Sequence, residues 1–344
     1  MKNYKINTFL LLFLFFTACE NDKKSILKES NKINSFFETY FNDKVNRSPM
    51  YQARLGIKKD YDKWDDISPK SDTLELTIAK NALKWIKDSI NINLLNDQTE
   101  LSYRLFKQSL ENQIKDFKYR LHNYPVNQMY GYHSRVPAFL INIHKVDSKK
   151  DAEDYIVRLT GIKDLFNQLE KNLIERELVG IVPPQFVYHH VIDDSKNIIS
   201  GLPFNGTDSS ALFKDFVEKI EILNLEKNEK ERLINQAKNA LLYSVLPAYQ
   251  SLINLLEKQM VNSTKDDGVW KWPNGDKFYS NALKRTTTTD MTIEEIHQLG
   301  LSEVERIHKE MVIIKDKVGF KGSLKSFFNE LKYNEKYYYP QSES

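Results

Sequence analysis

Long stretches of the sequence repeat apolar residues every three or four positions and contain few residues that break a helix. The clearest is residues 151–178, where Tyr155 and Ile162 are among the apolar side chains that share one helical face. Gly180 and Pro183 end this stretch, because proline cannot donate the backbone hydrogen bond that a helix needs. The chain has only 11 glycines and 10 prolines in 344 residues. The sequence therefore predicts a mostly α fold.

The other expected elements follow from the same periodicity and from its interruptions. Helices are predicted at residues 71–95 and 99–122, and two helical stretches are predicted within 218–260. Pro247 should kink or interrupt the second, longer stretch. In residues 266–290 the helical pattern stops. Aromatic residues flank an Asn-Gly pair there, and four consecutive threonines follow, so we predict one short β-hairpin and then extended backbone.

A further helix should begin at the capping box formed by Thr292 and Glu295 and end at Gly319. Its apolar residues recur at helical spacing, so we predict that they form a buried face. These residues are Ile296, Leu299, Val304, Ile307, Met311 and Ile314.

The first 24 residues have the features of a targeting signal. Lysines precede an unbroken apolar run at residues 9–16, and small residues then lead to Cys19, the only cysteine of the chain. This order is typical of a bacterial lipoprotein signal, after whose cleavage Cys19 carries acyl chains such as palmitate. An ordinary signal peptide beside an unrelated cysteine is the alternative. The apolar run is too short to span the roughly 30 Å hydrocarbon core of a bilayer.

These features predict three parts of the chain: a signal peptide at 1–18, a polar tether at 19–30 and a helical domain at 31–344. The mature protein should be anchored by lipid in the bacterial cell envelope, at the outer membrane. The sequence does not decide whether it faces the periplasm or the cell surface.

Charge and cysteine content exclude several classes of function. The 50 Lys and Arg residues nearly balance the 47 Asp and Glu residues, unlike the basic surface of a nucleic-acid-binding protein. A single cysteine excludes internal disulfides and cysteine metal clusters. The sequence also lacks a Gly-x-Ser-x-Gly elbow, a phosphate-binding glycine loop and a dinucleotide-binding fingerprint. Nucleic acid is therefore not an expected partner, and stability must come from apolar burial.

Several segments together resemble a known bacterial family, domain of unknown function 885. The most specific block spans 268–312, and the resemblance covers roughly residues 30–340. The matching segments are Ala53–Gly56, Trp64–Ser68, Asp151–Tyr155, Gly180–Pro184, Gly268–Trp270, Pro273–Gly275, Thr286–Thr288 and Thr292–Leu301.

The resemblance implies a zincin-like helical assembly related to zinc metallopeptidases, many of them lipoproteins. Family members carry a His-Glu-x-x-x-Gly-His-His helix in a C-terminal half, with a further glutamate beyond it. None of the seven histidines here begins such a motif, so the resemblance implies only the N-terminal portion of the family. We therefore expect no catalytic residues, no metal ligands and no cofactor. Zinc is expected only if the missing half is supplied.

Some residues nevertheless remain candidates for a site. By analogy with gluzincin-like enzymes, Tyr279, Arg285 and Thr287 could hold a peptide along the strand edge of the hairpin. The alternative is a purely structural hairpin. His297 and His308 lie eleven residues apart on one helical face and could line a cleft. The alternative is that both are ordinary surface or core residues.

Residues 189–194 offer one possible replacement for the missing metal site. His189 with Asp193, and His190 with Asp194, have the i, i+4 spacing of helical metal ligands. A polar helix face is the simpler interpretation, because Val191 and Ile192 between them are apolar.

Three functional hypotheses remain open. The first is a membrane-anchored lipoprotein that forms the N-terminal part of a zinc-peptidase-like protein and is inactive alone. The second is an active hydrolase or peptidase that uses His297 or His308, or that a second chain completes. The third is a non-catalytic lipoprotein that binds peptides or acts as a scaffold. The first hypothesis predicts helices with large exposed apolar patches.

Overall fold

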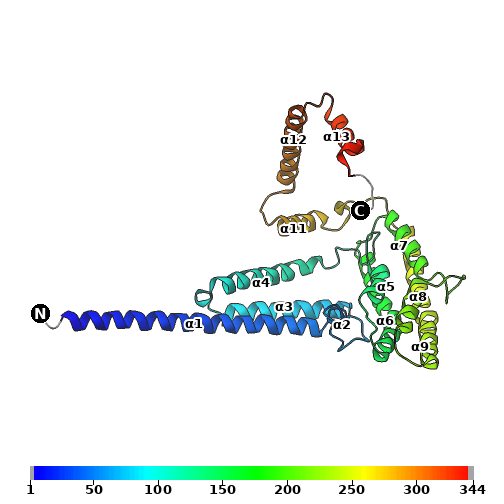
Figure 1. The fold of residues 1–344 in the computed structure, drawn as a ribbon, viewed down its shortest axis with the longest axis horizontal. Helices are drawn as coiled ribbons and strands as arrows, with labels where there is room; N and C mark the ends of the chain where they lie inside the picture. Colours follow the sequence, from blue (N-terminus) through cyan, green and yellow to red (C-terminus); the bar gives the residue numbers. More distant parts are fainter. Residues whose placement is uncertain (1–3, 340–344) are drawn as a thin grey trace. The chain divides into compact units, whose positions relative to one another are not determined.

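A computed structural model describes the backbone of residues 4–339 and the side chains of residues 22–339. The side chains of the expected signal peptide and of Cys19 therefore lie outside the described residues. The chain forms two compact units, Met1–Asn274 (unit 1) and Gly275–Ser344 (unit 2). Regular structure in the described residues is helical, with isolated bridges and no strands (Figure 1). The predicted mostly α fold is confirmed.

The N-terminal part of unit 1 is a group of three long helices that we name the arm (Figure 1). The arm consists of α1 (Tyr4–Asn46), α3 (Pro69–Ser89) and α4 (Asp97–Asp116). The short helix η1 (Ile92–Leu94) lies at the turn between α3 and α4, and α2 (Pro49–Arg54) follows α1.

The arm has a hydrophobic core of its own. The ring of Phe36 on α1 stacks on Trp85 of α3, with 4.1 Å between ring centroids. Phe37 and Tyr40 meet the ring of Phe106 on α4 at 5.0 Å in each case. Buried residues of the three helices and of the turn between α3 and α4 complete this core, namely Ile33, Ala79, Ala82, Ile86, Ile90, Leu95, Tyr103 and Leu110.

The tip of the arm is held by side chains of α1. The Glu29 carboxylate accepts a hydrogen bond from the amide of Asn91 at 2.8 Å, and the Ser30 hydroxyl accepts one from the amide of Asn96 at 3.0 Å. Ser30 is buried. The last two residues of the expected tether at 19–30 thus belong to the packed helix.

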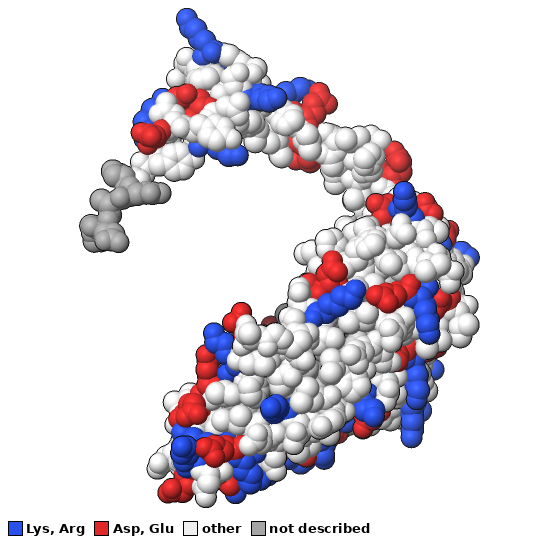
Figure 2. Space-filling view, turned by 90° about the vertical axis from the view of Figure 1, so that its right-hand side faces the viewer, with Lys and Arg blue, Asp and Glu red and all other residues white. Residues whose placement is uncertain are grey.

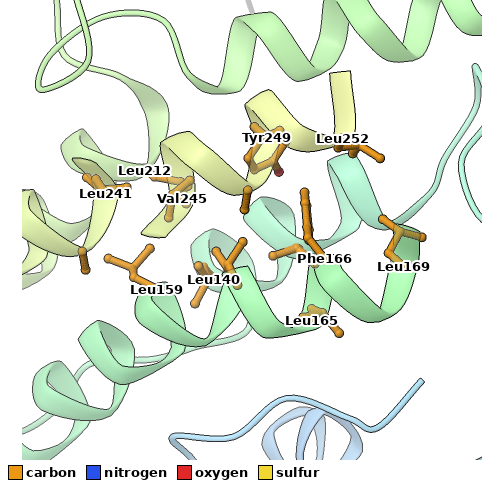
Figure 3. Packing of buried hydrophobic residues seen from close by; sticks show 14 of the residues in the cluster. Leu140, Leu159, Leu165, Phe166, Leu169, Leu212, Leu241, Val245, Tyr249 and Leu252 are labelled. Atoms are coloured by element: carbon orange, nitrogen blue, oxygen red, sulfur yellow. The ribbon is translucent and has the colours of Figure 1, made fainter. Parts of the chain in front are cut away.

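The remaining helices of unit 1 surround a larger core and form what we name the body. They are α5 (Tyr132–Asn142), α6 (Lys149–Leu178), α7 (Gln185–Ile198), α8 (Ala211–Glu221), α9 (Lys227–Ala240) and α10 (Leu246–Val261). Figure 3 shows apolar residues of α6, among them Leu159 and Phe166, facing Val245 and Tyr249. The rings of Phe166 and Tyr249 lie 4.8 Å apart. The helix predicted at 151–178 is confirmed and lines this core.

Pro247 interrupts its helical stretch, as predicted. Residues Leu241–Val245 form a π-helical turn between α9 and α10. Because proline lacks an amide hydrogen and its ring crowds the preceding turn, the regular i to i−4 hydrogen bonds cannot continue through it. The exposed Tyr243 lies on this turn.

Unit 2 contains α11 (Gly275–Thr287), α12 (Ile293–Lys317) and α13 (Leu324–Tyr333). The capping box at the start of α12 is confirmed: the Thr292 hydroxyl accepts from the Glu295 amide at 3.2 Å, and the Glu295 carboxylate accepts from the Thr292 amide at 2.7 Å. Gly319 follows the helix with a φ of 76°, which glycine adopts without strain.

The predicted β-hairpin in residues 266–290 is wrong. Val269–Lys271 form a 3₁₀ turn, and the Asn-Gly pair precedes a helix, with Asn274 at a φ of 55° and Gly275 as the first residue of α11. A hairpin needs alternating strands on both sides of its turn, and Lys277–Tyr279 is too short to supply one.

The threonine run also departs from the prediction. Thr286 and Thr287 continue α11. The Thr287 hydroxyl donates a hydrogen bond to the carbonyl of Leu283 at 2.9 Å, so its donor is satisfied within the helix. Thr288, with a φ of 57°, then ends the helix.

Candidate functional site

Tyr279, Arg285 and Thr287 lie on helix α11 rather than on an extended segment. Backbone amides inside a helix already bond to the helix itself, so α11 offers no free strand edge to a peptide. Tyr279 is 38% exposed and Arg285 is also exposed. Binding through strand addition is therefore excluded for this segment. Substrate binding by these side chains remains a prediction.

His297 and His308 are both exposed on α12. Their separation of eleven residues corresponds to about 16 Å along a helix. A general acid or base must come within hydrogen-bond reach of the reacting group. The two histidines therefore cannot act together on one reacting atom, and a role for either as a cleft residue remains a prediction.

A hollow of about 440 Å³ lies between α11 and the start of α12. Its lining includes an ion pair between Lys284 and Asp290, and the hydrogen bond from Lys284 lowers the pKa of Asp290. Thr292, which also lines it, is occupied by the capping box. Among the described lining residues, no nucleophilic side chain is hydrogen-bonded to a basic one. The candidate residues on α11 and α12 (Tyr279, Arg285, Thr287, His297 and His308) do not line the hollow.

Helix α12 carries a stripe of apolar side chains that we name the apolar seam: Val304, Ile307, Met311, Ile314 and Val318. Val304 is 51%, Ile314 55% and Val318 63% exposed. The sequence predicted a buried face here, and this prediction is wrong for the described unit. The spacing of three, four, three and four residues is the pattern by which one helix packs on another. The seam is therefore suited to contact with a further helix.

Unit 1 contains a buried charged cluster around Arg158. Its Nη1 donates to Nδ1 of His144 at 2.9 Å and its Nε donates to the carbonyl of Lys63 at 3.0 Å. The guanidinium also lies over the rings of Phe139 and Tyr61, at 4.8 and 5.0 Å from their centroids. Burial lowers the pKa of Arg158 to about 10, so the group stays charged at neutral pH.

His144 completes this cluster in its neutral form. Burial lowers the pKa of His144 to about 3. Its Nε2–H donates to the carbonyl of Asp151 at 2.9 Å, which leaves Nδ1 to accept from Arg158. Both side chains are fully buried, so this cluster joins α6 to the preceding loops and is closed to a substrate. The sequence signal for it is an arginine on the apolar face of residues 151–178.

The possible metal ligands on α7 do not form a site. His189, His190, Asp193 and Asp194 are exposed. Asp194 pairs with the buried His133 of α5 at 3.6 Å, and burial lowers the pKa of His133. Within the described part of the chain, no group of three or more His, Cys, Asp or Glu residues could hold a metal ion.

A second hollow, of about 560 Å³, lies beside α6, α9 and the π-helical turn. Arg232 at its edge bonds to Glu229 at 2.7 Å and lies 3.3 Å from Glu153. The hydrogen bond from Arg232 lowers the pKa of Glu229 to about 2. The basic and acidic groups thus neutralise one another. Amides, hydroxyls, the exposed Tyr243 ring and the apolar side chains of Ile156, Val157 and Ala240 supply the remaining lining.

The surface gives two further findings. The face in Figure 2 mixes basic and acidic side chains without a continuous basic stripe. Among the helices whose residues are described, none combines the length and apolarity that crossing a membrane would require.

The fold defines a mostly α protein whose similar solved structures are described as lipoproteins. A "putative lipoprotein" from Colwellia psychrerythraea superposes with a TM-score of 0.76 and 21% identity, over 91% of this chain and 56% of that one. A "putative lipoprotein of unknown function" from Shewanella oneidensis gives 0.59 and 15%, over 85% and 48%. The chain therefore spans about half the length of each.

The family follows from the sequence match. Residues 49–344 match DUF885, described as a bacterial protein of unknown function, and the chain belongs to this family. No curated protein matches the chain.

Proposed function

We propose that this chain is a lipid-anchored protein of the bacterial cell envelope, at the outer membrane, that forms the helical portion of a peptidase-like assembly and is inactive alone. Two observations support the anchor. The signal at residues 1–18 ends directly before Cys19, and both similar solved structures are described as lipoproteins.

The observation that carries the proposal is the apolar seam of α12. Burying one aliphatic side chain is worth about 1.5–3 kcal/mol, so a soluble helix seldom leaves such a stripe in water. Each solved relative contains about as much additional polypeptide as this chain matches. We propose that equivalent polypeptide packs a helix against the seam, either as a continuation of this chain or as a second chain.

The peptidase-like role is supported by the family resemblance of residues 268–312. The described residues offer no catalytic group in support of it. The described residues do not fit a zinc site, since no suitable group of ligands occurs among them. Any zinc would be held by the added polypeptide. This chain would contribute the anchor, the seam and the hollow beside α11, with peptides as the substrate class.

The test compares the purified mature chain alone with the same chain after addition of the product of an adjacent downstream reading frame. Zinc content and cleavage of a mixed peptide library are measured in both samples. We expect neither for the chain alone, and both in the mixture. Stoichiometric zinc with cleavage by this chain alone would overturn the proposal. Binding without cleavage in the mixture would favour the non-catalytic scaffold.

A matched pair of variants tests the seam itself. Val304→Asp places a carboxylate in the seam, and Ser302→Asp places the same group at an exposed position on α12 outside it. We expect V304D to abolish association with the added polypeptide and S302D to leave it unchanged. Light scattering of the chain alone shows whether a second copy covers the seam instead, and a stable V304D-sensitive dimer would contradict the proposed occupant.

A further inference from the structure

Three side chains on one face of α6 hold the two chain segments at the base of the arm, and we name these side chains the clamp: Gln168, Asn172 and Arg176. The amide of Ile67, just before α3, donates to Oε1 of Gln168 at 2.9 Å, and the carbonyl of Ile67 accepts from Nδ2 of Asn172 at 2.7 Å. One peptide segment is thus bonded on both sides by residues one helical turn apart.

Arg176, the third member of the clamp, holds the second segment at the base of the arm, which follows α4. Its guanidinium donates to the carbonyl and the side-chain oxygen of Asn123, with the shortest bond at 3.0 Å. It also donates to the carbonyl of Arg120 at 3.4 Å. Both Arg120 and Asn123 lie just after α4 in sequence, so the entry to α3 and the exit from α4 are attached to the same helix of the body.

The arm itself is stiff and directed away from the body. Its 21-residue helix α3 rises about 30 Å. Aromatic stacking and a separate core tie α1, α3 and α4 together. Helix α1 starts before the tip and runs past Glu29 and Ser30 into the arm, while α9 lies on the far side of unit 1 (Figure 1).

We propose that the arm is a rigid spacer that stands on the lipid surface with its tip toward the membrane and keeps the body about 30 Å from the headgroups. This inference rests on the proposed function, because it takes Cys19 as the anchor. The helix that carries the anchor continues into the arm, and the clamp transmits the arm's direction to the body. Exposed charges of both signs lie beside the tip, among them Lys23, Lys28 and Asp97, so the tip has the polar character that contact with lipid headgroups requires.

Neutron reflectometry on a supported bilayer measures this spacing directly. The mature chain is coupled through Cys19, its only thiol, to a maleimide lipid in a phosphatidylethanolamine and phosphatidylglycerol bilayer. We expect a thin protein layer of about 30 Å next to the headgroups and a dense layer beyond it. A dense layer in direct contact with the headgroups would overturn the proposal.

Two double variants examine the clamp. Gln168→Ala with Asn172→Ala removes both bonds to Ile67, whereas Asn167→Ala with Lys171→Ala changes two exposed residues of the same helix. Circular dichroism should show unchanged helicity in both variants. We expect the first variant to broaden the dense layer toward the membrane and the control to give the profile of the wild type. An unchanged profile in the clamp variant would show that the clamp does not set the spacing.

This experiment is independent of the test of the proposed function. Chemical coupling does not require that the cell acylates Cys19. If native acylation failed, the proposed anchor would be lost, but the spacing measured on the coupled chain would still stand. Conversely, a body lying flat on the bilayer would refute the spacer without affecting the zinc and peptidase results.

Discussion

Helices α6 and α12 have comparable lengths and opposite relations to a hydrophobic core. Of the 30 residues of α6, twelve are buried, among them Arg158 and Phe166. Of the 25 residues of α12, only Lys315 is buried. Both helices carry a clear apolar stripe in sequence. The difference teaches that periodicity identifies the stripe but does not identify what covers it.

The two helices also differ in what stabilises them. Packing of its stripe stabilises α6 within the body. Local features support α12: a capping box and ion pairs from Arg306 to Glu303 and Glu310, each at 2.7 Å. Such exposed pairs contribute little, because solvent screens the charges. On these grounds α6 should be far more sensitive to substitution than α12 in the isolated chain.

The largest effect is expected from Phe166→Ala. Removing a fully buried aromatic ring should lower the free energy of unfolding by about 3–5 kcal/mol. Urea denaturation followed by circular dichroism measures the change. Leu178→Ala, on the same helix at a position that is 82% exposed, is the control and should change stability by less than about 0.5 kcal/mol. Equal losses in the two variants would contradict the assignment of the core.

A pH dependence should come from His144. Its pKa is about 3 in the fold and about 6.5 in an unfolded chain, so the unfolded state binds more protons between these values. The resulting stability is present above pH 6.5 and is lost as the pH falls toward 3. Between pH 6.5 and pH 5 the loss should reach about 1.6 kcal/mol, because the slope rises from half of about 1.4 kcal/mol per pH unit at pH 6.5 to nearly the full value at pH 5.

Comparison of the wild type with His144→Gln isolates this contribution from other titrating groups. The urea midpoint of the variant should depend less steeply on pH over the same range. His190→Gln, at an exposed position, should keep the slope of the wild type. If the His144 variant also keeps the pH slope of the wild type, the buried neutral state assigned to His144 is wrong.

An intermediate effect is expected from Asn172→Ala in the clamp. The variant leaves the carbonyl of Ile67 without its 2.7 Å donor, which should cost about 1–2 kcal/mol in unfolding free energy. The exposed neighbour Lys171→Ala should be nearly neutral. Thermal unfolding of both variants in parallel measures the difference. If Asn172→Ala does not change the unfolding temperature, the bond from Asn172 to Ile67 does not stabilise the fold.

The smallest effect on the isolated chain is expected from Val304→Asp. Because Val304 is 51% exposed, its replacement should change the free energy of unfolding by about 0.5 kcal/mol or less. Urea denaturation of V304D and S302D side by side provides the measurement. A loss above about 2 kcal/mol in V304D would mean that the seam is already covered in the isolated chain. The proposed difference in burial between α6 and α12 would then be wrong.

The sequence was a good guide wherever local chemistry decides the structure. Thr292 with Glu295 marked the start of α12, Gly319 its end, and Pro247 the interruption before α10. The sequence led to a wrong prediction at Asn274-Gly275, because this dipeptide, which is common in hairpin turns, here precedes helix α11. Propensity could not reveal this, because the flanking segments are too short to show either period clearly.

The candidate sites were harder to predict for a different reason. Arg158 and His144 meet across fourteen residues of sequence, and only the fold brings the loop of Lys63 to them. The candidates on α11 depended on a strand that the described residues do not form, and those on α12 depended only on a shared helical face. Contacts between distant segments, unlike caps and turns, leave no local pattern to read.

The clamp also restricts how this sequence can change over evolution. Gln168, Asn172 and Arg176 share a face of α6 only because four residues separate each from the next. One residue inserted between them would turn the later members by about 100° and leave one of the two segments at the base of the arm unattached. Homologues should therefore vary in length in the loops around the arm, while insertions and deletions are absent from this part of α6.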